Sequence, residues 1–326
     1  MNEHSLSFWL CAALLAGAAL FTPLTAFAGS CCGGGGGVNL VLPKFYESMI
    51  DLSVDIEQYN GLWNNDGKYI DQPGYHLWQY RMNVGYAQRL TSRWQASVTV
   101  PYVWNYNGYP NKTSRSDGIG DMTLSFWYEA REDRSAWKIR SPGDLIPAVT
   151  IGPSLIIPTG ISPYDGVSDS TDVTGRGFYR LDGNILLDKT IHPWSATLAM
   201  SYGTYLERPV NQEYSKFVEP YHKKLGDRTS ASLSLSYIYY LGSGGDTLTG
   251  TASCSYLNEE NGTIDGRQDA TSGFRKETVG GAIAYSSTDH DWSFRVSWSH
   301  AVRHDGWGDN FPTTDIYTLG VRYGFR

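Results

Sequence analysis

Two short stretches of this sequence carry residue types that could do chemistry. In the first, His300-Ala-Val-Arg-His304-Asp305, followed by Asp309, two imidazoles stand beside carboxylates in the last long connection of the chain. A histidine held by a carboxylate can act as a general base in a hydrolase. Loops rich in His and Asp are more often solvated surface, and the chain has no G-x-S-x-G, H-E-x-x-H or P-loop pattern. A hydrolase that uses His300, His304 and Asp305 is therefore an alternative, and we expect no enzyme.

The second stretch is a pair of neighbouring cysteines, Cys31 and Cys32, followed by five glycines. Vicinal thiols can bind a thiophilic metal or become oxidised, and they can also be chemically idle. No third and fourth ligand stands nearby, so we predict no cofactor and keep Cys31 and Cys32 as the remaining metal candidates. The glycine run has too much backbone entropy to hold structure by itself, which predicts a flexible tail.

An export signal precedes this tail. Residues 8–20 form an apolar run too short to span a bilayer, and Ala26-Phe27-Ala28 places small residues at a cleavage site before Gly29. The first seven residues lack Lys and Arg, which departs from a typical signal. We expect three segments: a signal peptide at 1–28, a Cys/Gly-rich periplasmic tail or plug at 29–45, and the folded body at 46–326. The tail could also dock a periplasmic partner.

The composition narrows the class of protein. The chain has 326 residues with 23 Tyr, 11 Trp and 36 Gly, and only 18% of its residues are charged. No stretch reaches the ~18 consecutive apolar residues of a membrane-spanning helix. There are 26 basic and 33 acidic residues and no basic run of five, so we expect no nucleic-acid partner. A β-rich protein fits this composition.

The elements that must position all these residues are strands. From Asp121 to Glu129 the chain alternates, with Met122, Leu124 and Phe126 on one face. Successive side chains of a strand point to opposite sides, so this is a strand with one apolar and one mostly polar face. The pattern recurs twelve times, mostly over nine to eleven residues, within 49–57, 78–87, 94–102, 121–129, 146–158, 179–188, 194–202, 231–239, 248–256, 278–285, 292–299 and 317–325. Fourteen strands remain an alternative count.

The connections and the aromatic residues favour a barrel in a membrane over a soluble one. Connections of roughly 14 to 22 residues alternate with short ones of roughly 3 to 6, except after the fourth strand. This is typical of outer-membrane barrels, which have short periplasmic turns and long extracellular loops. Aromatic residues at the strand ends of the apolar face predict two girdles at the lipid–water interfaces: Trp78, Tyr86, Trp94, Tyr102, Tyr128, Trp194, Tyr202, Tyr256, Trp292, Trp298 and Phe325. We predict an all-β transmembrane antiparallel up-and-down barrel in the bacterial outer membrane, with lipid and the outer-membrane assembly machinery as partners.

Three short motifs carry a family resemblance. Asp117-Gly-Ile-Gly-Asp121 precedes a strand, Ser154-Leu-Ile-Ile-Pro-Thr-Gly160 ends one, and Gly175-Arg-Gly177 with Asp182 begins another. In order and spacing, from Asp117 to Ile191, they resemble the outer-membrane proteins of the MetA phenol-degradation pathway type. That resemblance implies an outer-membrane channel or transporter, often associated with the uptake of hydrophobic or aromatic compounds.

If the apolar faces meet lipid, the opposite faces line the lumen. Small polar residues there leave space, and charged residues stand between them: Asp51, Asp55, Glu57, Arg81, Asp121, Glu129, Arg180, Asp182, Asp188, Arg295 and Arg322. Such side chains can select a passing solute, or they can pair across strands and stiffen the wall. Twelve strands give a lumen between small barrels that side chains fill and wide porins. We therefore predict a narrow polar channel for small solutes; a structural barrel that works with a partner or metal at the cysteine tail is the alternative.

Overall fold

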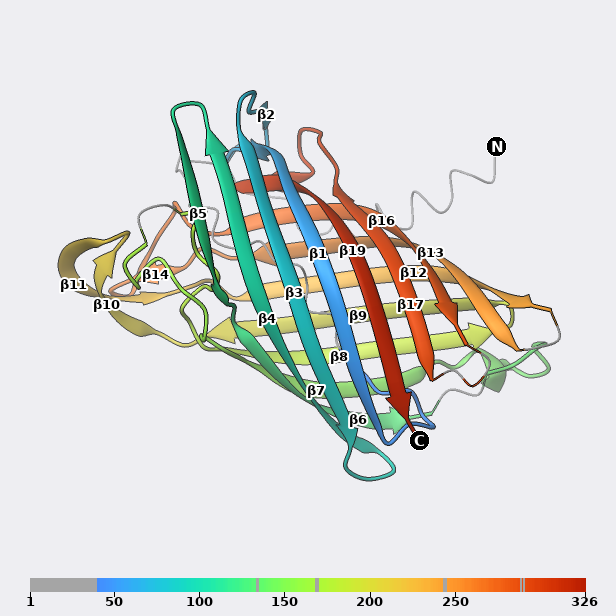
Figure 1. The fold of residues 1–326 in the computed structure, drawn as a ribbon. Coiled ribbons are helices and arrows are strands. Elements are labelled where there is room, and N and C mark those ends of the chain that lie inside the picture. Colours follow the sequence, from blue (N-terminus) through green and yellow to red (C-terminus); the bar gives the residue numbers. More distant parts are fainter. Residues whose placement is uncertain (1–39, 133–134, 168–169, 243–244, 288, 290) are drawn as a thin grey trace.

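The computed structural model describes residues 40–132, 135–167, 170–242, 245–287, 289 and 291–326. Twelve strands, each antiparallel to both neighbours, form one closed sheet, because the first of them pairs with the last (Figure 1). They are β1 (Ser48–Trp63), β3 (His76–Arg89), β4 (Trp94–Tyr109), β6 (Met122–Arg131), β7 (Ala148–Ile157), β8 (Arg180–Ile191), β9 (Trp194–Tyr205), β12 (Arg228–Leu241), β13 (Asp246–Glu259), β16 (Phe274–Ser286), β17 (Trp292–Ala301) and β19 (Phe311–Phe325). The predicted all-β barrel and the count of twelve are confirmed.

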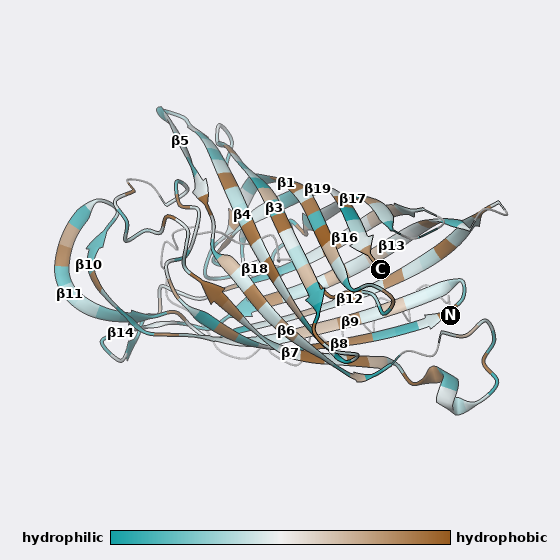
Figure 2. Cartoon of the chain, turned by 60° about the horizontal axis from the view of Figure 1, so that its bottom comes forward, coloured by the Kyte–Doolittle hydropathy of each residue, from teal (hydrophilic) through white to brown (hydrophobic). Residues whose placement is uncertain are grey.

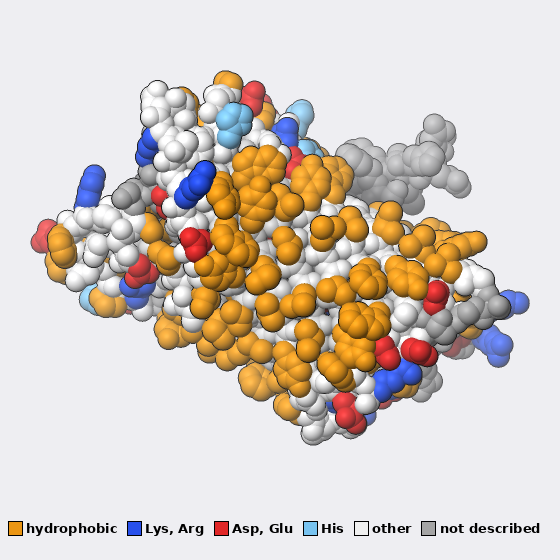
Figure 3. Space-filling view, viewed as in Figure 1, with side chains coloured by type: hydrophobic (Ala, Val, Ile, Leu, Met, Phe, Trp, Pro, Cys, Tyr) orange, Lys and Arg blue, Asp and Glu red, His pale blue; other side chains and the backbone are white. Residues whose placement is uncertain are grey.

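The polar side of each strand faces inward. In β1, Ile50, Leu52 and Val54 are about 40% exposed, whereas Asp51 and Asp55 on the opposite face are 9% exposed. Hydrophobic and hydrophilic residues alternate along the strands (Figure 2), and on the side shown in Figure 3 hydrophobic side chains form a broad band over the outer wall, with charged residues toward its ends. A soluble barrel would have its apolar face inside. The outward apolar band is the surface that a barrel presents to lipid.

The two ends of the barrel differ. The turns after β3, β8, β12 and β16 lie at the same end as Ser48 and Phe325, and we call this the periplasmic end. The long connections lie at the other end, the extracellular one. They contain the short strands β2 (Tyr69–Asp71), β5 (Lys112–Ile119), β10 (Arg208–Glu213), β11 (Lys216–Lys224), β14 (Thr263–Ile264), β15 (Arg267–Gln268) and β18 (Gly308–Asp309). The connection after β6 is the exceptional one and holds the 3-10 helix η2 (Pro142–Leu145). No helix among the described residues is long and apolar enough to cross a membrane.

One predicted loop is wrong. The stretch 104–118, predicted as a long loop between the strands at 94–102 and 121–129, is a hairpin in which the second half of β4 pairs with β5, from Tyr102 with Ile119 to Tyr109 with Lys112. The hairpin extends the wall beyond the rim (Figure 1). Backbone pairing between adjacent strands can continue into water, and in β4 the alternation continues with it, since Trp104 and Tyr106 face outward and Asn105 and Asn107 face inward. The predicted strand at 94–102 is therefore too short.

The segment before β1 enters the periplasmic end of the lumen. Leu40 and Leu42 are 4% and 3% exposed and pack with Tyr46, Met49 and Ala87. Leu40 lies so close to the inward-facing Gly85 that a Cβ there would approach its Cδ2 to 2.9 Å. Arg89 fixes the turn that follows by donating to the carbonyl oxygens of Pro43 (2.9 Å) and Tyr46 (3.0 Å).

Candidate solute pathway through the barrel

The predicted charged residues of β1 and β3 meet inside the lumen. The Arg81 guanidinium lies 3.4 Å from Glu57 Oε2 and 3.7 Å from Asp55 Oδ2. Asp55 also accepts hydrogen bonds from Asn83 (2.9 Å) and Thr318 (2.7 Å). All of these side chains except Asn83 and Thr318 are less than about a tenth exposed, so this side of the lumen is crowded with paired polar groups.

Toward the periplasmic end of the barrel, some of the predicted lumen residues make ion pairs or hydrogen bonds and one does not. Arg322 Nε donates to Asp51 Oδ2 at 2.8 Å, and Arg89 lies 4.0 Å from Glu129 near the periplasmic mouth. Asp188 accepts a hydrogen bond from Thr197 at 2.6 Å. Arg295 stands among Asp51, Asp55 and Arg322.

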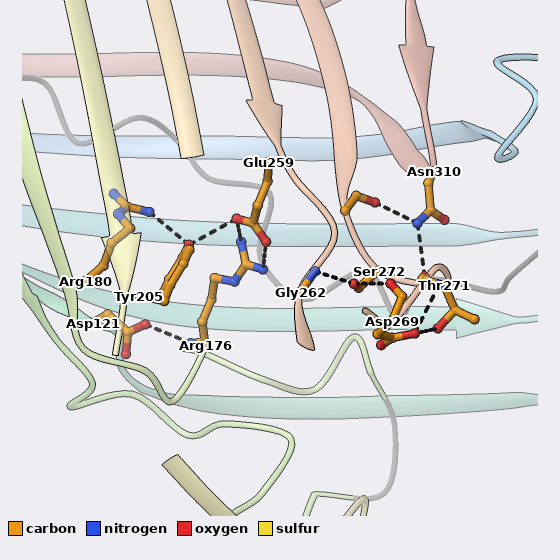
Figure 4. Close-up of polar contacts among 11 residues, drawn as sticks. Asp121, Arg176, Arg180, Tyr205, Glu259, Gly262, Asp269, Thr271, Ser272 and Asn310 are labelled. Atoms are coloured by element: carbon orange, nitrogen blue, oxygen red, sulfur yellow. Dashed lines mark hydrogen bonds and ion pairs between the residues drawn. The ribbon is translucent and has the colours of Figure 1, made fainter. Parts of the chain in front are cut away.

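At the extracellular mouth, Arg180 and Asp182 form an ion pair at 2.7 Å within β8. Arg180 also donates to the hydroxyl of Tyr205 (3.1 Å), and that hydroxyl donates to Glu259 (3.1 Å) (Figure 4). Glu259 completes the network with a bidentate pair to Arg176. The network therefore joins β8, β9 and β13 to the connection between β7 and β8.

Four charged residues of this region were not among the predicted site residues: Arg176, Arg228, Glu259 and Lys276. Arg228, Glu259 and Lys276 stand at strand ends, beyond the apolar alternation by which the strands were recognised. Each lies an even number of residues from an inward residue of its own strand, namely Ser230, Ser255 or Thr278. Since side chains of a strand alternate between its faces, this spacing was the signal that could have placed them in the lumen.

The three motifs of the family resemblance meet at the outer rim. Asp121 accepts hydrogen bonds from the backbone amides of Gly160 (3.1 Å) and Arg176 (2.7 Å), and the hydroxyl of Thr159 donates to the carbonyl of Gly120 (2.6 Å). A Cβ on Gly160 would lie 2.7 Å from Gly175, so these two backbones approach too closely for another residue. Asp121 therefore lies at the outer rim, just before β6, and Glu129 lies near the other end of β6.

Burial changes the acidity of this carboxyl. Desolvation raises the pKa of Asp121 above its ordinary value of 3.8, although the two backbone amides and the guanidiniums of Arg176 and Arg180 act in the opposite direction. Asp121 is thus a structural acceptor that holds the connection between β7 and β8 against the rim.

That connection folds inward over the mouth. Val173 and Phe178 are 1% and 2% exposed. Asn105 on the inner side of β4 donates to the carbonyl of Val173 (3.0 Å), and Asn107 donates to Asp172 (3.0 Å). The connection therefore narrows the extracellular opening on the side of β4.

The opposite wall is lined by small residues. The inward positions of β9, β12, β13, β16 and β17 are mostly Ser, Thr, Ala and Gly, and two of them, Ser232 and Ser253, are exposed although they face the lumen. On the crowded wall the inward Gln95 and Trp127 are 3% and 0% exposed. Open space in the barrel therefore lies along the small-residue wall, which we define as the inward faces of these five strands.

The histidines proposed for hydrolysis make other contacts. His300 Nδ1 lies 2.7 Å from Asp315, which also pairs with Arg303. His304 Nδ1 lies 3.0 Å from the carbonyl of Asp305, whose carboxylate accepts from the amide of Tyr69 (2.9 Å). None of these partners is a hydroxyl or thiol nucleophile, so the described contacts give the hydrolase hypothesis no support. Cys31 and Cys32 lie outside the described residues, and the described ones contain no cluster of His, Cys, Asp and Glu suited to a metal.

Comparison with known proteins supports the fold. An outer membrane channel from Pseudomonas putida F1 superposes with a TM-score of 0.62 at 14% identity, over 88% of this chain and all of that one. The β domain of the Bordetella autotransporter BrkA gives 0.51 at 13% identity, over 86% of this chain and all of that one. No family model and no curated protein matches the sequence.

The closed barrel and its outward apolar band together determine the location. In lipid every backbone polar group must be paired internally, and a closed barrel achieves this without an edge. Barrels with short turns at one end, long loops at the other and an aromatic-flanked apolar band belong to bacterial outer membranes. The protein is therefore an outer-membrane β-barrel, as the sequence predicts.

Proposed function

We propose that the protein is an outer-membrane channel that passes small solutes, among them hydrophobic or aromatic compounds, through a narrow polar lumen. The observation that carries this proposal is the small-residue wall. Ser232 faces the lumen and is exposed there, while the adjacent Leu233 is 39% exposed on the lipid face. Small polar side chains that stay exposed inside a closed wall are what a passing solute requires.

Aromatic side chains at the mouth support the solute class. A cavity of about 230 Å³ among the extracellular connections is lined by Tyr164 and Phe274, whose rings are partly exposed, beside Arg176. These two rings offer stacking surfaces to an aromatic solute on its way to the lumen. The resemblance to outer-membrane proteins of phenol-degradation pathways points to the same solutes.

The test is conductance in planar bilayers, with two variants of adjacent residues on β12. The purified protein should give discrete conductance steps. Ser232→Trp should lower the step size because the indole fills lumen space, whereas Leu233→Trp places the same ring in lipid and should leave it unchanged. Membranes that stay silent with correctly folded protein would refute the channel, whereas equal conductance from both variants would show that the solute path does not follow the small-residue wall. Liposome swelling with phenol-like, fatty and hydrophilic solutes then ranks the solutes.

A further inference from the structure

Charge is distributed unevenly around the lumen. The inward positions of the small-residue wall carry three basic side chains, Arg228, Lys276 and Arg295, and one acid, Glu259. Glu259 is 4% exposed and is occupied by both terminal nitrogens of Arg176. Lys276 is likewise only 4% exposed, so the positive charge that this wall presents to the open space comes from Arg228 and Arg295, which are partly exposed.

Arg228 stands at the extracellular end of this wall, as the first residue of β12. The charged groups around it are Arg180, Glu259 and Arg176. Two of these arginines have their own acids, since Arg180 pairs with Asp182 and Arg176 pairs with Glu259. Among the described residues Arg228 has no acidic hydrogen-bond or ion-pair partner. The three guanidiniums of Arg176, Arg180 and Arg228 therefore share only two carboxylates, those of Glu259 and Asp182.

Arg295, nearer the middle of the barrel, also lacks an acidic partner among the described residues. It lies on β17 between small neighbours, opposite Ala284 of β16 and Gly320 of β19. Its guanidinium covers Gly320, where a Cβ would come within 3.2 Å of Nη2. The nearby Asp51 and Asp55 are held by Arg322 and by Asn83, and Arg295 itself makes no hydrogen bond or ion pair with any described residue.

The carboxylates of the opposite wall do not offer a matching path for cations. Glu57, Asp55 and Asp51 are each 9% exposed or less, and each accepts from an arginine or an amide of the same wall. A buried carboxylate that is already held by an arginine or an amide attracts a passing cation far less than an exposed one would. Arg228 and Arg295, by contrast, are partly exposed and have no acidic hydrogen-bond or ion-pair partner among the described residues.

From this arrangement we infer that the solute route follows the small-residue wall and is selective for small anions, with Arg228 at its mouth and Arg295 at its middle as successive docking points. The inference rests on the proposed channel function and narrows its solutes to small organic anions such as aromatic carboxylates. Guanidinium groups suit this role because they bind carboxylates in a planar, two-bond geometry. Two docking points at different heights allow a solute to leave the first by moving to the second.

The experiment measures the reversal potential of the bilayer-reconstituted full chain under a gradient of KCl and then of potassium benzoate. The wild-type protein should be more permeable to chloride and to benzoate than to potassium. Arg228→Gln combined with Arg295→Gln should lower the anion-to-potassium permeability ratio by about fivefold, which is the effect of one charge contact at ~4 Å in water. Arg228→Lys with Arg295→Lys should largely preserve the ratio for chloride.

Two further variants make the result decisive. Ser253→Asp adds an acid to the same wall without removing either arginine, and it should lower the ratio even if the glutamine variant fails to fold. Arg267→Gln removes an exposed arginine of β15 in the extracellular loops and should change nothing. A conducting wild type that prefers potassium, or a ratio that Ser253→Asp leaves unchanged, overturns the anion route while the channel stands. An absence of conductance refutes the channel itself.

Discussion

Arg176 and Glu259 form a bidentate ion pair across the extracellular mouth, with Nη1–Oε2 at 2.7 Å and Nη2–Oε1 at 2.6 Å (Figure 4). Arg176 belongs to the connection between β7 and β8, whereas Glu259 ends β13, and in the barrel β9 and β12 separate β8 from β13. The pair therefore ties an inward-folded connection to a distant part of the wall. The Arg176 guanidinium is further held between the rings of Tyr205 and Phe274, at 5.3 and 5.5 Å.

Breaking this pair should loosen the mouth. Glu259→Gln leaves the Arg176 guanidinium largely buried without its counter-charge, and removing one partner of a buried pair costs about 3–5 kcal/mol. We expect a lower unfolding temperature in detergent and larger, noisier conductance steps, because the connection is released from the wall. Glu219→Gln, a change on the exposed surface of β11, is the control. Stability and conductance equal to those of the wild type would show that the pair does not hold the connection.

The segment before β1 should restrict the periplasmic opening. Leu40 and Leu42 are buried against Met49 and Ala87 inside the barrel. Leu40→Ser with Leu42→Ser removes about 1.5–3 kcal/mol of burial per side chain, which favours release of the segment. We expect larger conductance with an intact barrel, measured in bilayers beside circular dichroism. Phe45→Ser, at a position that is 81% exposed, should behave as wild type; an equal increase from that change would argue against a plug.

Asp121 should make the stability of the rim depend on pH. Its pKa is raised by burial, so the folded protein binds a proton more readily than the unfolded chain. The stabilisation from this group is complete below the ordinary pKa of 3.8 and declines as pH rises through the raised value. Asp121→Asn cannot ionise and should lack this decline. We therefore measure the unfolding free energy of both proteins from pH 3 upward. In that window the wild type should lose stability relative to Asp121→Asn, with a slope that corresponds to at most about one proton. A difference between the two proteins that does not change with pH contradicts the prediction.

How far the sequence could predict this structure depends on the solvent at each height of the barrel. Within the bilayer, lipid forces an apolar residue at every second position, and Leu52 or Val296 therefore reveals its strand directly. Above the bilayer that requirement ends, so the inward Arg228 is followed by Thr229 and Ser230 with no apolar residue to mark the strand, and the alternation of Trp104 and Tyr106 with Asn105 and Asn107 was the weaker signal for the second half of β4. The contacts of Asp121 join residues 39 and 55 positions apart through the folding of a long connection. A local pattern cannot encode such contacts, although the three motifs that make them were visible as separate stretches.

The orientation of the wall is open to a direct test on β17. Val296 pairs with Ile283 and Leu319 near the middle of the apolar band and is 58% exposed, whereas the next residue, Ser297, faces the lumen between Ala282 and Thr318. Val296→Arg places a charge in lipid, where an arginine at the midplane costs about 2–4 kcal/mol. Ser297→Arg places the same side chain among small polar neighbours and water, so its cost should be much smaller. We expect reversible unfolding in lipid vesicles to show lower stability for Val296→Arg alone. In planar bilayers we expect lower conductance for Ser297→Arg alone, because its side chain occupies the lumen.

The opposite assignment of these two effects would mean that the polar face meets lipid. Equal effects from both variants would mean that this part of β17 does not separate lipid from lumen.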